Sequence, residues 1–232
     1  MGLDLYAKIE PYLDFEDEVR YLHKAFLSII FEKDLDNILD VGCGQGAFLN
    51  HLKANAKTAC GIDLSVEQIK VCKSFGLDAK TIPLNKVTEK FDCITAIFDV
   101  INYISNETLK TFLEDAFFAL NENGYFIFDT NSLFGFEEIA QGSLNINQDD
   151  KFIAIDAVFE ESKLITDITL FTKDKKNLFK KEQDSITQYY HDLKVLKKTL
   201  IEVGFTIEKI NNFNLHTDEE ADKLIFVCKK SK

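Results

Sequence analysis

Hydrophobic and polar positions follow two alternating periods along the chain as far as residue 131. Short continuous apolar runs, typical of strands covered on both faces, precede stretches with apolar residues every three or four positions, typical of amphipathic helices. This alternation predicts an α/β fold with a parallel sheet and crossover helices. The predicted strands are residues 37–41, 58–63, 79–82, 91–98 and 124–131, and the predicted helices are 46–55, 65–76 and 109–120.

The pattern differs on either side of this core. Residues 14–32 have helical spacing and predict a helix ahead of the first strand, whereas residues 150–190 contain three strand-like stretches separated by polar turns. We interpret 150–190 as an antiparallel β insertion that forms a lid. The whole chain, 1–232, is predicted to form one domain. The remaining predicted elements are a helix at 193–203 and strands at 205–210 and 223–230.

The charge of the chain excludes some partners. Lys and Arg number 27 against 39 Asp and Glu, a net charge of −12, so no nucleic acid is expected as a partner. Arg20 is the only arginine, so lysines or backbone N–H groups would have to bind an anionic ligand. No apolar run approaches the roughly 20 residues of a membrane helix, and no signal-peptide pattern is present. We therefore expect a cytoplasmic protein without a membrane partner.

Cysteine and histidine suggest no metal site. The five cysteines include no C-x-x-C pair and are typical of reduced, buried thiols. The four histidines are not spaced as metal ligands, so no metal is expected. Nothing in the pattern indicates an oligomeric state.

A glycine-rich segment between the first strand and the next helix, Asp40-Val41-Gly42-Cys43-Gly44-Gln45-Gly46-Ala47, is the most informative motif. Glycines allow a tight turn and close approach of a ligand, and free N–H groups at the helix start can bind a carboxylate or phosphate. Gly42, Gly44 and Ala47 also fit the dinucleotide fingerprint, with Asp63 placed to bind a ribose. Asp40 and the tighter glycine spacing favour a ligand with an amino-acid tail. Cys43 has no histidine partner in a motif and is interpreted as loop packing.

At this point the sequence resembles the class I S-adenosylmethionine-dependent methyltransferases. LDVGCGQGAF (39–48) matches their first motif, and GIDLS (61–65), FDCITAIFDVINYI (91–104) and IEVGF (201–205) are similar to later ones. The resemblance covers residues 37–130 and 190–229. It implies a Rossmann-like, doubly wound seven-stranded sheet in the order 3-2-1-4-5-7-6 with strand 7 antiparallel. It also implies S-adenosylmethionine as cofactor and S-adenosylhomocysteine as product. The antiparallel β insertion predicted from the pattern follows strand 5, in a region that is variable in such enzymes.

The resemblance assigns cofactor contacts to individual residues. Asp63 would bind both ribose hydroxyls, with Leu64 beside the adenine, although Asp63 could instead only support the helix start at Ser65. Asp40 could likewise be a loop brace that touches no ligand. Phe98 would line the sulfonium region. The methionine end would lie against Asp40, Gly42, Cys43, Gly44 and Gly46.

The adenine edge departs from the family pattern. The acid usually found after the third strand is missing, which leaves Thr81, Ile82 and nearby Asp78 as candidates.

Acceptor residues are expected at the carboxyl ends of strands four and five, where open α/β sheets bind ligands. Asp99, Tyr103 and His191 are candidate general bases, with helix capping as the alternative for His191. The predicted function is methyl transfer by in-line displacement to a nitrogen or oxygen of a small molecule. A nicotinamide-dependent oxidoreductase and a non-catalytic cofactor-binding module are the alternatives. The candidate acceptor-binding residues are Tyr6, Tyr12, Asn102, Asn131 and Tyr190.

Overall fold

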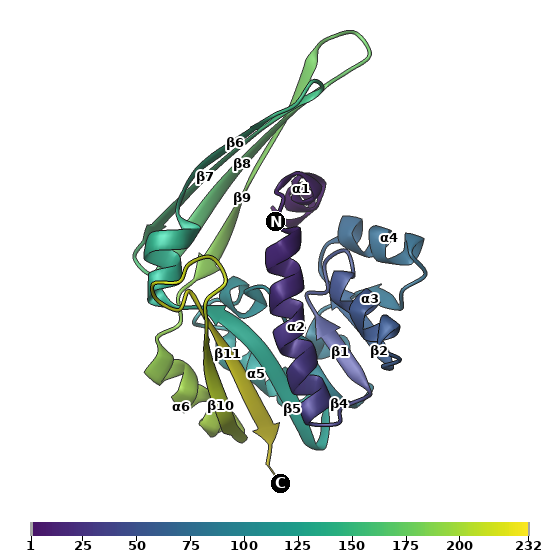
Figure 1. The fold of residues 1–232 in the computed structure, drawn as a ribbon, viewed down its shortest axis with the longest axis vertical. Helices are drawn as coiled ribbons and strands as arrows, with labels where there is room; N and C mark the ends of the chain where they lie inside the picture. Colours follow the sequence, from purple (N-terminus) through teal and green to yellow (C-terminus); the bar gives the residue numbers. More distant parts are fainter. Residues whose placement is uncertain (1, 232) are drawn as a thin grey trace.

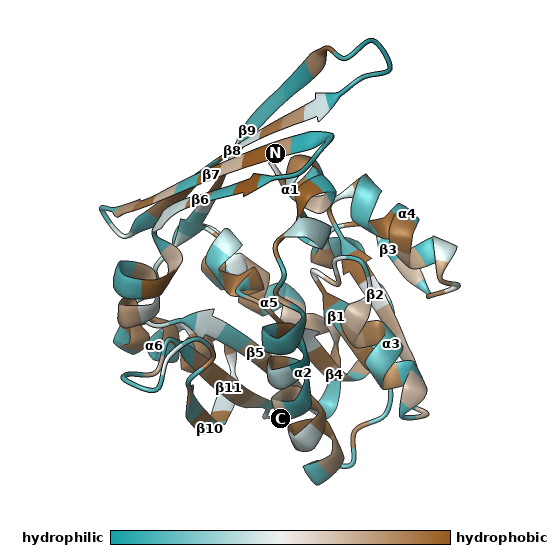
Figure 2. Cartoon of the chain, turned by 45° about the horizontal axis from the view of Figure 1, so that its top comes forward, coloured by the Kyte–Doolittle hydropathy of each residue, from teal (hydrophilic) through white to brown (hydrophobic). Residues whose placement is uncertain are grey.

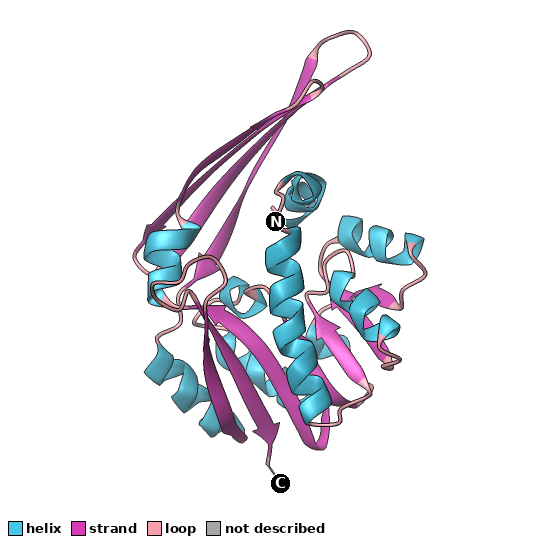
Figure 3. Ribbon diagram, viewed as in Figure 1, coloured by secondary structure: helices cyan, strands magenta, loops and turns pink. Residues whose placement is uncertain are grey.

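Seven strands form one sheet in the order β10-β11-β5-β4-β1-β2-β3 in this computed structural model, which describes residues 2–231 (Figures 1 and 3). Strands β1 to β5 are parallel, and β11 runs antiparallel to both β5 and β10. This confirms the predicted order. The bounds are β1 Ile38–Val41, β2 Ala59–Asp63, β3 Ala79–Thr81, β4 Phe91–Ala96, β5 Leu120–Asn131, β10 Phe205–Phe213 and β11 Lys223–Lys230.

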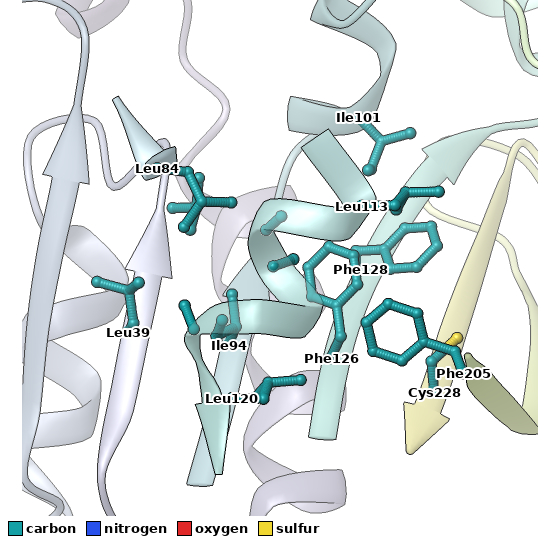
Figure 4. Packing of buried hydrophobic residues seen from close by; sticks show 14 of the residues in the cluster. Leu39, Leu84, Ile94, Ile101, Leu113, Leu120, Phe126, Phe128, Phe205 and Cys228 are labelled. Atoms are coloured by element: carbon teal, nitrogen blue, oxygen red, sulfur yellow. The ribbon is translucent and has the colours of Figure 1, made fainter. Parts of the chain in front are cut away.

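Successive residues of the central strands are buried on opposite faces of the sheet. Phe126 and Phe128 of β5 pack on one face with Leu113 (Figure 4), and Ile127 between them packs on the other face with Phe26. Because side chains alternate along a strand, a strand covered on both sides must be apolar at every position. That requirement explains why the strands were visible as continuous apolar runs.

Five helices cover the two faces. Ser65 caps α4 by accepting a hydrogen bond from the N–H of Gln68, and Gly204 ends α6 with φ +116°. Within residues 2–231, no helix is both long and apolar enough to cross a membrane. The bounds are α2 Glu16–Glu32, α3 Ala47–Ala54, α4 Val66–Ser74, α5 Leu109–Ala119 and α6 Leu193–Val203.

Strand β5 begins earlier than predicted. Residues 121–123 were expected to separate the helix from the strand, yet they lie within β5. Pairing with β4 shifts there, and Asn123 has φ +63°. The side-chain amide of Asn121 donates to the carboxylate of Asp92 at 2.8 Å, which holds this irregular start against β4.

The insertion is a four-stranded antiparallel sheet in the order β6-β7-β8-β9, which projects from the body of the molecule (Figure 1). Its last three strands were predicted. β6 was missed because it begins with glycine and is polar or exposed along most of its length. The bounds are β6 Gly142–Asn147, β7 Lys151–Glu160, β8 Lys163–Lys173 and β9 Phe179–Tyr189.

A short helix that the pattern did not predict, α1 (Leu3–Ile9), lies beneath this insertion and beside α4 (Figure 2). A 3₁₀ turn at Glu10–Tyr12 follows it. Leu5 and Ile9 pack against Ile168 and Ile186 of the insertion. With only seven residues, α1 is too short to show a reliable helical period.

Candidate active site

A cavity of about 540 Å³ lies at the carboxyl ends of β1, β2 and β4. The glycine loop and the end of β2 form one wall, and α1, α2 and the turn after β3 form the others. The predicted residues that line it are Tyr6, Asp40, Gly42, Cys43, Gly44, Asp63, Leu64, Ile82, Phe98 and Tyr103.

The three glycines of the loop all have positive φ, at +70° for Gly42, +52° for Gly44 and +84° for Gly46. A Cβ on Gly42 would lie 2.5 Å from Val100, and one on Gly46 would lie 2.4 Å from Leu77. A Cβ on Gly44 would meet no atom within 4 Å. Gly42 and Gly46 are thus required by packing, whereas Gly44 borders open space in the cavity wall.

Asp63 at the end of β2 holds the loop and the next helix together. One carboxylate oxygen accepts from the N–H of Gly44 at 3.0 Å, and the other accepts from the N–H of Ser65 at 2.8 Å. Burial raises the pKa of Asp63, and the backbone hydrogen bonds oppose that shift. Each oxygen has a second acceptor site, so supporting the helix start and binding ribose hydroxyls are compatible roles.

Asp40 is buried at the end of β1, and its carboxylate accepts from the hydroxyl of Thr95 at 2.8 Å. Burial raises its pKa to about 7, although that hydrogen bond opposes the shift. A buried acid with this pKa is easily ionised by a nearby cation, such as the ammonium of an amino-acid tail.

The bend after β4 places Phe98 in the cavity wall. Phe98 and Asp99 have φ +61° and +64°, a conformation that non-glycine residues seldom adopt. The buried carboxylate of Asp129 stabilises this bend by accepting from both N–H groups, at 2.7 and 3.2 Å.

Tyr103 lines the cavity near Tyr6. Burial raises its pKa well above the ordinary value, and Tyr6 and Asp99 add to the shift. Its phenol is therefore protonated at neutral pH, so Tyr103 can donate a hydrogen bond but is a poor proton acceptor. This weakens its candidacy as a general base.

The structure places His191 away from the cavity lining. Its Nε2 lies 3.0 Å from the carbonyl oxygen of Ile101 and its Nδ1 lies 2.8 Å from the amide of Asn106. With both ring nitrogens engaged, the imidazole braces the segment after β4, so its geometry does not support a general-base role. Capping is not its role either, because Asp192 caps α6.

Three other predicted residues belong to a buried polar network outside the cavity lining. The ammonium of Lys223 contacts the carboxylates of Asp99 and Asp129 and the side-chain oxygen of Asn131. Asn102 accepts from the N–H of Asn131 at 3.0 Å and donates to the carbonyl of Tyr189 at 2.9 Å. Asn102 therefore joins the insertion to the sheet, and Asp99 and Asn131 bind Lys223 of β11; none of the three lines the cavity.

The remaining predictions also lie outside the lining. Tyr190 packs edge-on against Phe136, and the ring of Tyr12 lies 5.3 Å from the ammonium of Lys151. Thr81 and Asp78 are exposed and do not line the cavity, although Ile82 does.

Glu10 is a cavity residue that the sequence pattern did not reveal. Its carboxylate accepts from the side-chain amides of Gln45 at 3.2 Å and Gln68 at 2.8 Å, and burial raises its pKa. Gln68 stands three residues after the N-cap Ser65, where a capping box places a side chain that binds back to the cap, but its amide binds Glu10 instead. Together with the hydrogen bond from Ser65 to Asp4 at 2.5 Å, these contacts fasten α1 over the glycine loop.

Comparison with known proteins agrees with this architecture. The family model described as a methyltransferase domain matches residues 15–209. A protein of Geobacillus sp. (strain WCH70), named as a methyltransferase, is 24% identical over 208 residues, which cover 83% of this chain and 84% of the relative.

Two solved structures share the fold. The S-adenosylmethionine-dependent methyltransferase of Clostridium acetobutylicum has a TM-score of 0.81 at 22% identity, covering 98% of this chain and 100% of that one. The sugar N-methyltransferase of a Streptoalloteichus species has a TM-score of 0.76 at 14% identity, covering 99% and 92%.

The family match decides between the two interpretations of the glycine loop, since it covers the loop and most of the chain. S-adenosylmethionine, not a nicotinamide dinucleotide, is the cofactor. The chain belongs to the methyltransferase domain family and is a class I S-adenosylmethionine-dependent methyltransferase.

Proposed function

We propose that the enzyme methylates a small molecule that is uncharged or cationic, with an amine nitrogen as the preferred nucleophile and a hydroxyl oxygen as the alternative. The observation that carries this proposal is the charge of the cavity. Among the described residues that line it there is no lysine or arginine, while four carboxylic acids are present. These acids are Glu10, Asp40, Asp63 and Asp115.

This set of side chains disfavours an anionic acceptor. A phosphate or carboxylate in the cavity would lie near several acids without a cationic partner, and juxtaposed like charges cost several kcal/mol in binding. An amine, by contrast, is attracted as the ammonium and reacts as the free base after its proton has passed to water. The Streptoalloteichus relative, a sugar N-methyltransferase by name, is consistent with a nitrogen acceptor.

The size and cover of the cavity support a small acceptor. The cavity of about 540 Å³ is within the range of small-molecule sites and must hold the cofactor as well, so the space left for the acceptor is small. α1 lies over one side of the cavity and packs against the insertion through Leu5 and Ile9. Such a roof suits a small molecule that can be enclosed, and it would exclude water from the reaction.

We assign the cofactor to the glycine loop and the two strand-end acids. Asp63 would accept from the ribose hydroxyls, Gly44 would lie against the ligand, and Asp40 would accept from the ammonium of the amino-acid tail. Bound there, S-adenosylmethionine supplies a methyl group on a cationic sulfur. The residues of the chain then need to align the acceptor, and orientation can contribute roughly 7–11 kcal/mol.

The affinity for S-adenosylhomocysteine is expected to fall by up to about tenfold between pH 8 and pH 5.5, because protonated Asp40 has no charge to offer the ammonium. Asp40→Asn should weaken binding about tenfold at pH 8 and flatten this dependence. Calorimetric titration between pH 5.5 and 8 measures both effects. Glu10 and Asp63 also face the cavity, so an unchanged pH dependence in Asp40→Asn would assign the titration to them instead.

Three acceptors built on one sugar test the acceptor class. With glucosamine, glucose and glucosamine 6-phosphate, we expect glucosamine to yield S-adenosylhomocysteine at least tenfold faster than the other two. A preference for the phosphorylated sugar would overturn the charge argument. If S-adenosylhomocysteine binds but none of the three compounds reacts, glucosamine and glucosamine 6-phosphate are excluded as acceptors.

A further inference from the structure

One face of α2 presents a histidine to the cavity. Phe15, Val19 and His23 follow one another at single-turn spacing, and all three line it. The ring of His23 lies 5.0 Å from that of Phe48 and 6.0 Å from that of Phe98, measured between centroids. His23 therefore lies between the start of α3 and the end of β4, beside the wall assigned to the amino-acid tail of the cofactor.

His23 is paired with a second histidine. Its Nδ1 lies 3.1 Å from Nδ1 of His51, a half-buried residue of α3. One Nδ1 must donate and the other must accept, so the two rings hold complementary tautomers. When His51 donates, the proton of neutral His23 is on Nε2.

The second ring nitrogen of His23 remains available. Nε2 has no hydrogen-bond partner among residues 2–231. The fully buried side-chain polar atom without a partner in that range is Oε1 of Gln68, so Nε2 of His23 is not sealed in the core. Since His23 is 4% exposed and lines the cavity, Nε2 is the polar atom that it can offer to a ligand. Burial, with His51 nearby, lowers the pKa of His23 to about 3, so the ring is neutral before a ligand binds.

We propose that Nε2–H of His23 donates to the carboxylate of the cofactor's amino-acid tail, and that His51 is the positioning residue that holds this tautomer. The described cavity wall has no lysine or arginine to neutralise that carboxylate, so its donors must be neutral. Backbone N–H groups at the start of α3 are one source, and a neutral imidazole beside Phe48 is a second one. The assignment concerns the cofactor and does not depend on the acceptor.

Two ligands that differ only in the tail test this assignment. S-adenosylhomocysteine carries the amino-acid tail, and 5′-methylthioadenosine has a methyl group in its place. His23→Phe is expected to lower the affinity for S-adenosylhomocysteine about tenfold, the effect of losing one hydrogen bond to a charged group. The affinity for 5′-methylthioadenosine should change by less than twofold. His23→Gln, whose amide N–H can reach a similar point, should restore part of the loss. Calorimetric titration measures both affinities.

Two further variants complete the experiment. His51→Leu should reproduce a weaker form of the same selective loss. Lys24→Met, on the exposed face of α2, should change neither affinity. If His23→Phe lowers the affinity for both ligands equally, His23 only packs in the cavity wall and the proposal is overturned. An unchanged affinity for S-adenosylhomocysteine would also overturn it. If the unsubstituted protein binds neither ligand, the cofactor assignment fails, and the histidine assignment fails with it.

Discussion

Replacing Asp63 by alanine is expected to lower the affinity for S-adenosylhomocysteine about 100-fold or more. The change removes the acceptor for two ribose hydroxyls, and a hydrogen bond to a charged group contributes about 1.5–3 kcal/mol. It also releases the N–H of Gly44, which the carboxylate holds at 3.0 Å. Calorimetric titration of the ligand into the purified variant measures this loss.

Asp78→Ala is a suitable control, because Asp78 is an exposed acid close to the end of α4 and does not line the cavity. Asp63→Asn should give an intermediate loss, since the amide oxygen can still accept one hydrogen bond but carries no charge. An unchanged affinity in Asp63→Ala would remove Asp63 from the cofactor site.

Lys223→Met is expected to destabilise the fold by about 3–5 kcal/mol at pH 8, the usual effect of breaking a buried ion pair from one side. Lys223 is 2% exposed and its ammonium lies 3.1 Å from the carboxylate of Asp129, which is 0% exposed. Without the ammonium, Asp129 would either stay charged beside Asp99 or take up a proton from solution, and both cost free energy at pH 8. Urea denaturation of the variant and of the unsubstituted protein measures the difference.

The loss of stability caused by Lys223→Met should be smaller at low pH. Burial raises the pKa of Asp129 to about 7 even though Lys223 opposes the shift, and the pKa must rise further when Lys223 is removed. At pH 5.5 Asp129 in the variant is therefore neutral and needs no cation. Lys209→Met, on the exposed surface of β10, should leave the free energy of unfolding almost unchanged at both values of pH. A Lys223→Met loss that is the same at pH 5.5 and pH 8 would contradict this account.

The central sheet and the glycine loop were predictable because their physical requirements act locally. A strand covered on both faces needs apolar residues throughout, as Phe126, Ile127 and Phe128 show. A loop with φ +52° to +84° at three positions needs glycine there. Both requirements are visible within a few residues of sequence.

The use of the polar residues near the cavity was not predictable in this way. The strand-end rule correctly indicated a cluster after β4 and β5, but Asp99 and Asn131 are drawn into a network by Lys223, which lies in the last strand. Whether a side chain faces a ligand or a buried cation depends on this distant partner. Glu10 was missed for a related reason, since its partners Gln45 and Gln68 are distant in sequence and α1 is too short to show a period.

The position of α1 couples the two ligands of the reaction. Glu10, immediately after α1, binds the glycine-loop side through Gln45, and Lys8 forms an ion pair with Glu182 of the insertion at 2.5 Å. A cofactor that orders this segment lowers the entropic cost of binding an acceptor that contacts the same segment. Because coupling is reciprocal, such an acceptor raises the affinity for the cofactor by the same factor. We therefore expect cofactor and acceptor to bind cooperatively, because one short segment contacts both the glycine loop and the insertion.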